Sequence, residues 1–420
     1  MLQCKTKWKK KNLGNICNSI TTGKLDANAM VEGGEYRFYT CAENYFQIDT
    51  FAFEGPSLLI SGNGANVGYV HYYDGKFNAY QRTYVLQKFS EDIFYIKHYL
   101  KAYLKDRIAK EVNAGNIPFI KLDTLTDMHI YYPVDQNEQK RIADMLSTCD
   151  EVIEKTEETI EKYKQIKSGM MQDLFTRGLD ANGKLRPIYE QSPDLYKYAE
   201  ELDRYIPKEW SVKTFNKLIE ENIIDSIQDG NHGEKHPKAS DFVATGIPFI
   251  MANNITKDGH VDLKNCNFIT YEQYKSLRIG FATENDVLLT HKGTVGLTAI
   301  IPSGIKDVML TPQVTYYRIK DSSRLDKNYL YTYFQSPMFQ NILQGLSEQS
   351  TRAYIGITKQ AELNCIYMNI AEQKNIGKVI AKINDKLKFE QEILSKYKQI
   401  KQGLMKRLLT PPADAEIVEE

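Results

Sequence analysis

Glycine-rich and histidine-rich segments are the places where this chain could carry chemistry. Residues 62–68 read GNGANVG, but a nucleotide-binding loop needs a helix directly after its glycines, so that the helix N-terminus can hold phosphate. The residues that follow, VGYVHYY, are typical of a strand, so we predict a hairpin turn. The seven histidines form no HExxH motif and no ligand pair with cysteine. The sequence therefore favours a protein that is not an enzyme and holds no cofactor of its own.

Polar loops remain as candidate binding sites. Residues 229–238, DGNHGEKHPK, are dense in hydrogen-bond donors, and residues 290–294, THKGT, are predicted to form a hairpin tip. Asn and Gln can read adenine and Arg and Lys can read guanine, whereas other Lys contacts only position the DNA backbone. Any one such residue more often just builds a turn, so the hypothesis of DNA binding depends on the set. The candidate DNA-binding residues are Asn63, Asn66, Gln81, Arg82, Asn231, His232, Lys235, His236, His291, Lys292, Thr294 and Gln313.

The element that must position these loops occurs twice. Residues 138–176 and 372–410 align without a gap, and fifteen of the 39 positions are identical, including the block KYKQIK. In both copies apolar residues recur at alternating steps of four and three, which predicts a helix about 60 Å long with one narrow apolar seam. Two related helices with the same exposed seam are expected to pair as a coiled coil. Thr156 and Lys167, with Glu390 and Lys401 in the second copy, are matching polar breaks in that seam.

Two β-rich domains accompany the helices, and they resemble each other. Residues 54–68 parallel 284–296, and residues 77–86 parallel 309–319, which predicts that Gln81 and Gln313 are equivalent. We therefore expect an α+β fold with two pseudo-repeated β-rich domains, separated by two long helices that pair as a coiled coil. The predicted segments are domain 1 (1–135), spacer helix 1 (136–176), a connector (177–206), domain 2 (207–370), spacer helix 2 (371–410) and a flexible acidic tail (411–420).

Composition limits the possible environments. Acidic and basic residues number 54 each, so local patches must carry any attraction to nucleic acid. The six cysteines contain no CxxC pair, which argues against zinc and against a disulfide framework. No apolar run reaches the length of a membrane span, and the N-terminus is unlike a signal peptide. A cytoplasmic protein without membrane contact fits these features.

The motifs together, in their order, resemble the specificity subunits of type I restriction–modification systems. The matching segments are Trp8, Pro207–Trp210, Asp229-Gly230-x-His232, TGIPFI at 245–250, LLTHKGTVG at 288–296, both EQK-type helix starts with their KYKQIK centres, and LFTRGLDANGKLR at 174–186. The resemblance implies that the two pseudo-repeated β-rich domains are target-recognition domains and that the two long helices pair as an antiparallel coiled coil. It implies a bipartite DNA site, one half read by each domain, with the helices setting the gap. It also implies two methyltransferase subunits and restriction/translocase subunits as partners, with S-adenosylmethionine, ATP and Mg on those subunits.

Two features leave alternatives open. Domain 1 lacks the DGxH loop and the GIPFI run of domain 2, so contacts implied for domain 2 do not transfer to it directly. Net neutrality suggests that the isolated chain binds DNA weakly and that partners add phosphate contacts. The alternative is a non-catalytic coiled-coil scaffold with peptide-binding β-rich domains. A scaffold should expose apolar grooves, whereas these loops carry Asn, Gln, Lys and His.

Overall fold

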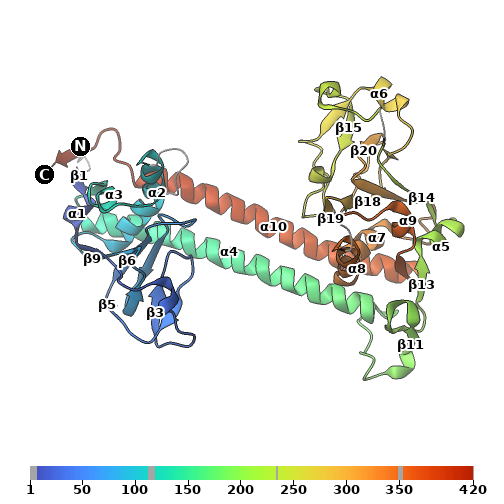
Figure 1. The fold of residues 1–420 in the computed structure, drawn as a ribbon, viewed down its shortest axis with the longest axis horizontal. Coiled ribbons are helices and arrows are strands. Elements are labelled where there is room, and N and C mark those ends of the chain that lie inside the picture. Colours follow the sequence, from blue (N-terminus) through green and yellow to red (C-terminus); the bar gives the residue numbers. More distant parts are fainter. Residues whose placement is uncertain (1–6, 112–118, 233–234, 349–352, 420) are drawn as a thin grey trace, which may run out of the picture. The chain divides into compact units, whose positions relative to one another are not determined.

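The fold consists of two compact units that share the two long helices (Figure 1). The computed structural model describes residues 7–111, 119–232, 235–348 and 353–419. Unit 1 comprises the chain up to Thr159 together with the part from Glu390 onward, and unit 2 spans Ile160–Phe389. The boundary between the units therefore cuts through both long helices. We use domain 1 and domain 2 for the globular parts, residues 7–135 and 207–370.

The described residues of domain 1 form three small sheets and three α-helices. The first sheet has the order β2 (Cys17–Thr22), β9 (Thr83–Phe89), β6 (Ser57–Ser61), β7 (Val70–Tyr73). The second has the order β4 (Phe46–Ile48), β3 (Tyr36–Tyr39), β8 (Lys76–Ala79), β5 (Phe53–Glu54). The third contains β10 (His129–Pro133), β1 (Lys7–Asn12) and β23 (Glu416–Glu419). The helices are α1 (Leu13–Ile16), α2 (Ile93–Glu111) and α3 (Leu122–Thr126).

Domain 2 repeats this topology. Its first sheet has the order β14 (Ile224–Asp229), β21 (Val314–Ile319), β18 (Val287–Lys292), β19 (Thr294–Ile300). Its second has the order β16 (Asn267–Ile269), β15 (Ile247–Ile250), β20 (Val308–Leu310), β17 (Phe281–Ala282), and its third pairs β13 (Ser211–Thr214) with β22 (Asn364–Tyr367). The helices are α5 (Phe215–Glu220), α6 (Tyr271–Ser276), α7 (Lys327–Phe334), α8 (Pro337–Glu348) and α9 (Ile357–Ala361).

The long helices, α4 (Gln136–Thr176) and α10 (Ile370–Leu408), pair in opposite directions. In unit 1 the Nζ of Lys398 lies 2.6 Å from Glu157 Oε1. In unit 2 the Nζ of Lys386 lies 5.6 Å from the ring centre of Tyr163. Later residues of α4 thus face earlier residues of α10. The predicted α+β class with an antiparallel helix pair is confirmed.

The polar breaks in the seam are satisfied by polar partners. In unit 1 Lys401 forms an ion pair with Asp150. In unit 2 the Nζ of Lys167 donates to Gln335 Oε1 over 3.0 Å. The ion pair of Lys401 with Asp150 joins the two long helices and is lost when they slide, so it favours this register. The bond of Lys167 to Gln335, which follows α7, fixes α4 to domain 2.

Each unit buries the start of one long helix and the end of the other. Ile142 and Leu146 near the start of α4 pack in the core of unit 1, which also contains Leu409, just after α10. The core of unit 2 contains the equivalent residues of the repeat, Ile376 and Ile380 in α10 with Phe175 in α4. Burying these side chains makes the helix ends part of each core, so each helix is held firmly where it leaves its domain.

A buried glutamine fixes the start of each helix to its domain. Gln139 and Gln373 occupy the same position of the repeat, and both are fully buried. The Gln139 amide donates to Pro133 O over 2.9 Å and Glu91 Oε2 over 2.8 Å, and its Oε1 accepts from Asp92 N over 3.1 Å. The Gln373 amide donates to Met368 O over 2.8 Å and Arg324 O over 3.0 Å, and its Oε1 accepts from Asp326 N over 2.9 Å.

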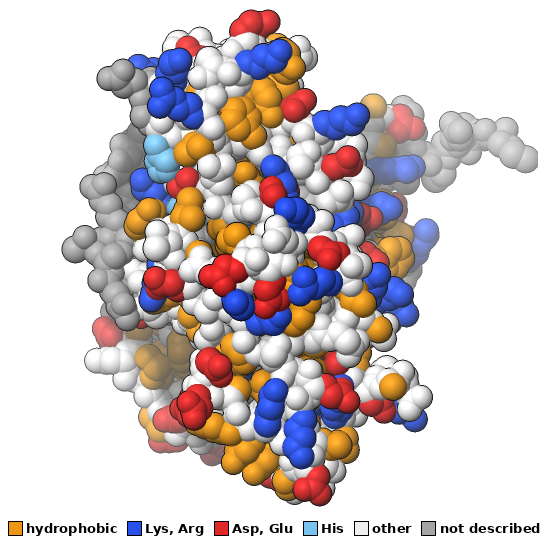
Figure 2. Space-filling view, turned by 90° about the vertical axis from the view of Figure 1, so that its right-hand side faces the viewer, with side chains coloured by type: hydrophobic (Ala, Val, Ile, Leu, Met, Phe, Trp, Pro, Cys, Tyr) orange, Lys and Arg blue, Asp and Glu red, His pale blue; other side chains and the backbone are white. Residues whose placement is uncertain are grey.

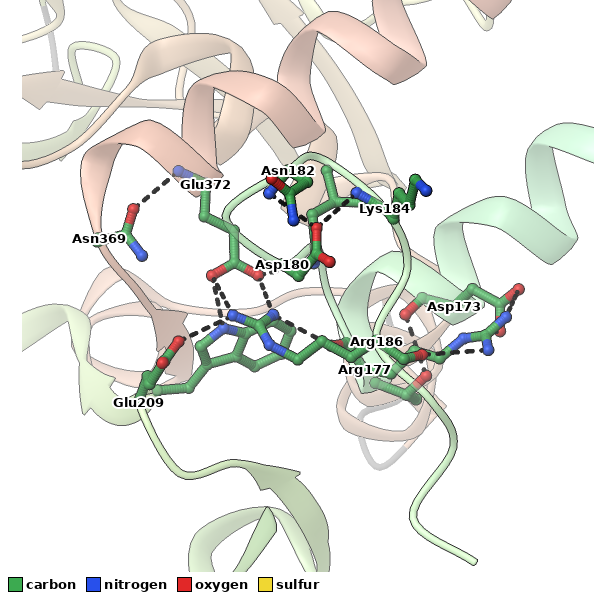
Figure 3. A network of polar contacts seen from close by, with 12 residues as sticks. Asp173, Arg177, Asp180, Asn182, Lys184, Arg186, Glu209, Asn369 and Glu372 are labelled. Carbon is green, nitrogen blue, oxygen red and sulfur yellow. Dashed lines mark hydrogen bonds and ion pairs between the residues drawn. The ribbon is translucent and has the colours of Figure 1, made fainter. Parts of the chain in front are cut away.

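The connector joins α4 to domain 2 through a buried ion pair (Figure 3). The guanidinium of Arg186 lies 2.5 Å from Glu372 Oε1 and 2.9 Å from Glu209 Oε2. Glu372, 3% exposed, also accepts from the backbone N–H of Leu179 over 2.8 Å and from the indole N–H of Trp210 over 3.2 Å. The carboxylate of Glu372 is therefore satisfied on both oxygens, as a buried charge requires.

One expectation for the irregular segments needs correction. The tail over 411–420 was expected to be flexible, but β23 pairs in parallel with β1, with Lys7 opposite Glu416. Its central residues Ile417 and Val418 are β-branched, which favours a strand. The connector contains the antiparallel hairpin β11 (Tyr196–Ala199) and β12 (Arg204–Pro207).

Candidate nucleic-acid interface

Four predicted residues of domain 1 gather at one edge of its first sheet. Ser61, at the end of β6, pairs with Thr83, at the start of β9, and Thr22, the last residue of β2, pairs with Tyr84. The segments that leave these strands therefore meet at that edge. They carry the half-buried Asn63 and Asn66 and the exposed Gln81 and Arg82.

Backbone hydrogen bonds hold these segments together. The N–H of Gly62 donates to Arg82 O over 2.9 Å, and the N–H of Gln81 donates to Leu25 O over 2.8 Å. The side-chain amide of Asn66 donates to Cys41 O over 3.3 Å. The polar side chains are thus presented by loops of defined shape, which is what selective recognition requires.

The equivalent edge of domain 2 carries the other predicted residues. Asp229, at the end of β14, pairs with Thr315, and Thr290 in β18 pairs with Val314, the first residue of β21. The residues brought together there are Asn231, His232, Lys235, His236, His291, Lys292, Thr294 and Gln313; Gly233 and Glu234 of the same loop lie outside the described residues. Each predicted set is therefore assembled at one sheet edge.

One backbone hydrogen-bond pattern recurs at both edges and defines which positions are equivalent. In domain 1 Gly62 donates to Arg82 O and accepts from Ile120 N over 2.8 Å. In domain 2 His291 donates to Gln313 O over 3.0 Å and accepts from Ile355 N over 3.0 Å. Gly62 is thus equivalent to His291, and Arg82 is equivalent to Gln313.

This pattern corrects the predicted equivalence of Gln81 with Gln313. Leu59 and Leu288 lie in matching core clusters, whereas Leu58 belongs to the cluster on the opposite face of its sheet. The sequence comparison was therefore displaced by one residue in these strands. Such a displacement exchanges the two faces of a strand, because successive side chains point in opposite directions.

A close backbone crossing explains the glycine of the DG motif. A Cβ at Gly230 would collide with Leu310 O, and a Cβ at Gly23 would collide with the equivalent Ala79 O. Domain 1 thus has a counterpart of the DG turn, at Thr22-Gly23. The exposed Lys24 that follows lies at the same edge, and sequence reasoning missed it because the motif has no Asp or His there. Only the shared crossing reveals it.

Burial separates the candidate residues into three groups. One group, Asn63, Asn66 and His236, is half-buried. Seven are exposed and free to contact a ligand: Gln81, Arg82, His232, Lys235, Lys292, Thr294 and Gln313. Asn231 and His291 are only 4% and 1% exposed, which contradicts a direct role in reading bases. His291 Nδ1 lies 2.9 Å from Ile355 O, and burial lowers the pKa of its imidazole, so the ring is neutral near pH 7. These two residues shape the loop.

His232 is positioned by an acidic neighbour. Its Nε2 lies 2.7 Å from Asp229 Oδ2, while its side chain is 53% exposed and that of Asp229 is 6% exposed. The carboxylate orients the ring and leaves Nδ1 available. His236 Nδ1, by contrast, lies 3.1 Å from Asn231 O and is half-buried, so it closes the loop.

The described ranges contain no candidate metal site. No group of three or more His, Cys, Asp or Glu side chains there could hold a metal ion. No helix among those residues is long and apolar enough to cross a membrane. On the face in Figure 2, acidic and basic side chains are interspersed and form no single basic surface, in keeping with the neutral net charge. The arrangement suits recognition through hydrogen bonds.

Known proteins share both the sequence and the architecture. The family model for the type I restriction modification DNA specificity domain matches residues 5–165. The EcoDI specificity subunit of Escherichia coli is 29% identical over 269 residues, which cover 60% of this chain and 59% of that protein. The MjaVIII specificity subunit of Methanocaldococcus jannaschii is 24% identical over 84% of this chain and 78% of its own. In sequence, the chain is thus similar to type I restriction–modification specificity subunits.

A solved specificity subunit also has the same fold. The S subunit of a type I restriction–modification system from M. genitalium superposes with a TM-score of 0.63 over 98% of this chain and 99% of that one, at 16% identity. The family match covers domain 1 and the first part of α4, whereas the structural match extends over both domains. The resemblance inferred from the motifs is confirmed.

Proposed function

We propose that this protein is a specificity subunit, the non-catalytic DNA-reading component of a type I restriction–modification complex. Domain 1 reads one half of a bipartite site, domain 2 reads the other, and α4 and α10 set the unread gap. The observation that carries the proposal is the recurrence of one loop arrangement at equivalent sheet edges. Each edge presents exposed side chains that can donate to base edges or phosphates, such as Arg82 and Lys292.

The attachment of the helices supports the role of a spacer. The helix start is buried in the core of each unit, and Gln139 or Gln373 adds three hydrogen bonds there. A domain fixed in this way cannot rotate freely about its helix, so helix length is passed on to the position of the reading loops. The ion pair Lys401–Asp150 resists sliding of α10 along α4, and the hydrogen bond of Lys167 to Gln335 resists sliding of α4 along domain 2.

Catalysis in the proposed complex belongs to partner subunits. Two methyltransferase subunits would supply S-adenosylmethionine and the methyl transfer, and restriction/translocase subunits would supply ATP- and Mg-dependent work in the cytoplasm. The neutral net charge supports this division, because phosphate neutralisation provides much of the affinity for DNA. We therefore expect the chain alone to bind DNA weakly and the assembled methyltransferase complex to bind tightly.

Methylation mapping tests the proposal directly. The chain is co-expressed with its neighbouring methyltransferase, and methylated adenines are located across a genome by single-molecule sequencing. We expect a two-part motif with a fixed unread gap. A continuous motif would mean that one domain alone reads DNA. No motif, with expression and assembly of the complex verified, would favour the coiled-coil scaffold.

Lengthening both helices tests the spacer role. Seven residues, one heptad, are inserted at facing positions, after Glu158 in α4 and after Ile393 in α10, so that the seam pattern is retained. The insertion lengthens each helix by about 10 Å. The gap in the methylated motif should then grow while both half-sites stay the same. Altered half-sites would show that the helices take part in reading.

A further inference from the structure

An exposed aromatic residue stands beside each reading loop. Phe119 is 54% exposed and Tyr354 is 44% exposed. Each precedes a buried isoleucine, Ile120 at 5% and Ile355 at 2% exposure, which packs into the core of its own unit. The isoleucine anchors the segment, and the alternation of an extended chain then directs the aromatic ring outward.

Backbone pairing places the two rings at equivalent positions. Phe119 forms an antiparallel bridge with Asn63, and Tyr354 forms one with Lys292. Asn63 and Lys292 each directly follow the residue of the recurring hydrogen-bond pattern, Gly62 or His291. Two loops that differ in sequence and length thus each keep an outward aromatic ring next to a predicted DNA-contacting residue.

The fold itself does not account for this exposure. Among the described residues, Phe119 belongs to none of the hydrophobic clusters. The ring of Tyr354 is tilted against that of His291, with 5.7 Å between the ring centres, and the Nζ of Lys292 lies over it at 5.9 Å from its centre; these contacts leave 44% of the residue exposed. Leaving such a ring in water forgoes the free energy that its burial would provide. A ligand that covers both rings would explain why the same position is aromatic in both domains.

We propose that Phe119 and Tyr354 are the apolar base contacts of the two half-sites, one ring per domain, packing against the bases of double-stranded DNA. The inference rests on the proposed function. Polar neighbours such as Asn63 and Lys292 reach base edges or phosphates, and the ring packs on a thymine methyl group or against a base step that it partly opens. Contacts of this kind are local, so each ring serves the half-site of its own domain.

A binding experiment with divided sites tests this. The complex with its methyltransferase subunits is titrated with four duplexes: the full site, the site with either half scrambled, and the site with both scrambled. For the unaltered complex, scrambling either half-site should lower the affinity, and we call this fold-loss of affinity the penalty for that half-site. Phe119→Ala should reduce the loss of affinity caused by scrambling the half-site of domain 1 by about 5- to 100-fold, the range expected when one aromatic contact to a base is lost. The loss caused by scrambling the other half-site should be unchanged. Tyr354→Ala should reduce the other penalty.

Conservative variants separate the ring from its other properties. Phe119→Tyr and Tyr354→Phe keep the ring and should retain both penalties. Tyr198→Ala, at a tyrosine 50% exposed on the connector hairpin, is the matched control and should also retain both. Assembly of each variant is checked by size-exclusion chromatography and its folding by thermal melting.

The outcomes distinguish this inference from the proposed function. If the unaltered complex shows two penalties and both alanine variants keep them, the rings are not base contacts and the proposed function stands. Equal reduction of both penalties by one variant would also overturn the inference, because a local contact cannot act on the distant half-site. An unaltered complex without any half-site penalty would overturn both.

Discussion

The two reading edges have the same hydrogen-bond framework and different side chains within it. At the position that donates to Arg82 O in domain 1 and to Gln313 O in domain 2, the residues are Gly62 and His291. A Cβ at Gly62 would collide with Arg82 O, whereas domain 2 accommodates a whole imidazole that is hydrogen-bonded to Ile355 O. The framework therefore fixes where the loops lie, and the side chains are free to differ between two half-sites.

The two units also differ in the contacts made by the glutamate at the start of their long helix, Glu372 in α10 and Glu138 in α4. Glu372 in unit 2 is 3% exposed and holds Arg186, Leu179 and Trp210. Glu138, its partner in the repeat, is half-buried and forms no ion pair among the described residues. Unit 2 receives a connector that brings an arginine, and unit 1 is completed by β23. The same helix start is thus reinforced in two different ways.

Replacing Arg186 should have the largest effect, because it removes the ion pair that only unit 2 has. Arg186→Met leaves the buried carboxylate of Glu372 without its counterion, which typically costs about 3–5 kcal/mol. Unit 2 should lose that much stability in urea unfolding, and unit 1 should be unchanged. The two tryptophans report separately: in a Trp8→Phe background, fluorescence follows Trp210 in unit 2, and in a Trp210→Phe background it follows Trp8 in unit 1.

The control for this prediction is the equivalent carboxylate. Glu138→Gln should change the stability of unit 1 by less than about 0.5 kcal/mol, as expected for a residue outside any buried network. A double variant, Arg186→Met with Glu372→Leu, should recover much of the loss, because no uncompensated charge remains. A loss of less than about 1 kcal/mol in Arg186→Met alone would contradict the structural role given to the ion pair.

The buried glutamines should show the opposite behaviour, equal effects in both units. Gln139→Leu leaves Asp92 N and Pro133 O without the partner seen here, and Gln373→Leu does the same in unit 2. Each buried group left unsatisfied costs about 1–3 kcal/mol. We expect each variant to destabilise its own unit by about 2 kcal/mol, measured with the two tryptophan reporters. Gln136→Leu, at the exposed first residue of α4, serves as control. Unequal losses would mean that only one helix start is fixed in this way.

Acid should distinguish the units through a histidine that the repeat does not share. His98 in α2 is fully buried beside Ser147 and Asp150, and burial lowers its pKa to about 4. The unfolded chain binds a proton near pH 6.5, so lowering the pH from 6.5 to about 4 favours unfolding of unit 1. The loss is on the order of 2 kcal/mol. The equivalent position in α7 is Thr332, whose hydroxyl donates to Asn328 O over 2.6 Å.

His98→Thr is therefore the matched variant. It should flatten the stability of unit 1 between pH 6.5 and 4, followed with Trp8 in the Trp210→Phe background. The pH response of unit 2 should stay as it is, because the pKa of its own buried His291 is lowered independently. An unchanged pH profile for unit 1 would assign its acid sensitivity to other groups, such as Asp150, whose pKa is also lowered.

Periodicity was sufficient to predict the long helices, because the apolar seam repeats over 39 residues in both copies. It was not sufficient for the strands. The sequences of short strands, four to seven residues long, can be aligned between the two domains almost equally well when displaced by one position. The correct alignment follows only from the strand pairing of Ser61 with Thr83 and of Thr290 with Val314. The tail was missed because a four-residue strand needs a partner edge that no local pattern reveals.

The polar residues of the site could be predicted from the sequence. Which of them are buried, and which aromatic residues lie beside them, could not. Residue types identified Arg82, Lys292 and Gln313, which are exposed. They also identified His291, whose side chain points into the fold, because a sequence does not distinguish the two faces of a strand end. Phe119 and Tyr354 lie far along the chain from the loops they accompany, and an isolated aromatic residue is normally read as core.

The smallest effect is expected at Asn63 and Lys292, the two equivalent residues that directly follow Gly62 and His291. Lys292 is exposed at a hairpin turn, and its flexible ammonium suits a phosphate, whereas the half-buried Asn63 presents an amide that suits a base edge. Lys292→Ala should weaken binding of the assembled complex to all sequences by a few-fold and lower the slope of log K against log salt by about 1. Asn63→Ala should leave that slope unchanged and relax the preference for one base in its half-site. Fluorescence anisotropy at several salt concentrations measures both. If Lys292→Ala relaxed one base instead, the two equivalent positions would both read sequence, and the difference between the domains would lie in the base chosen.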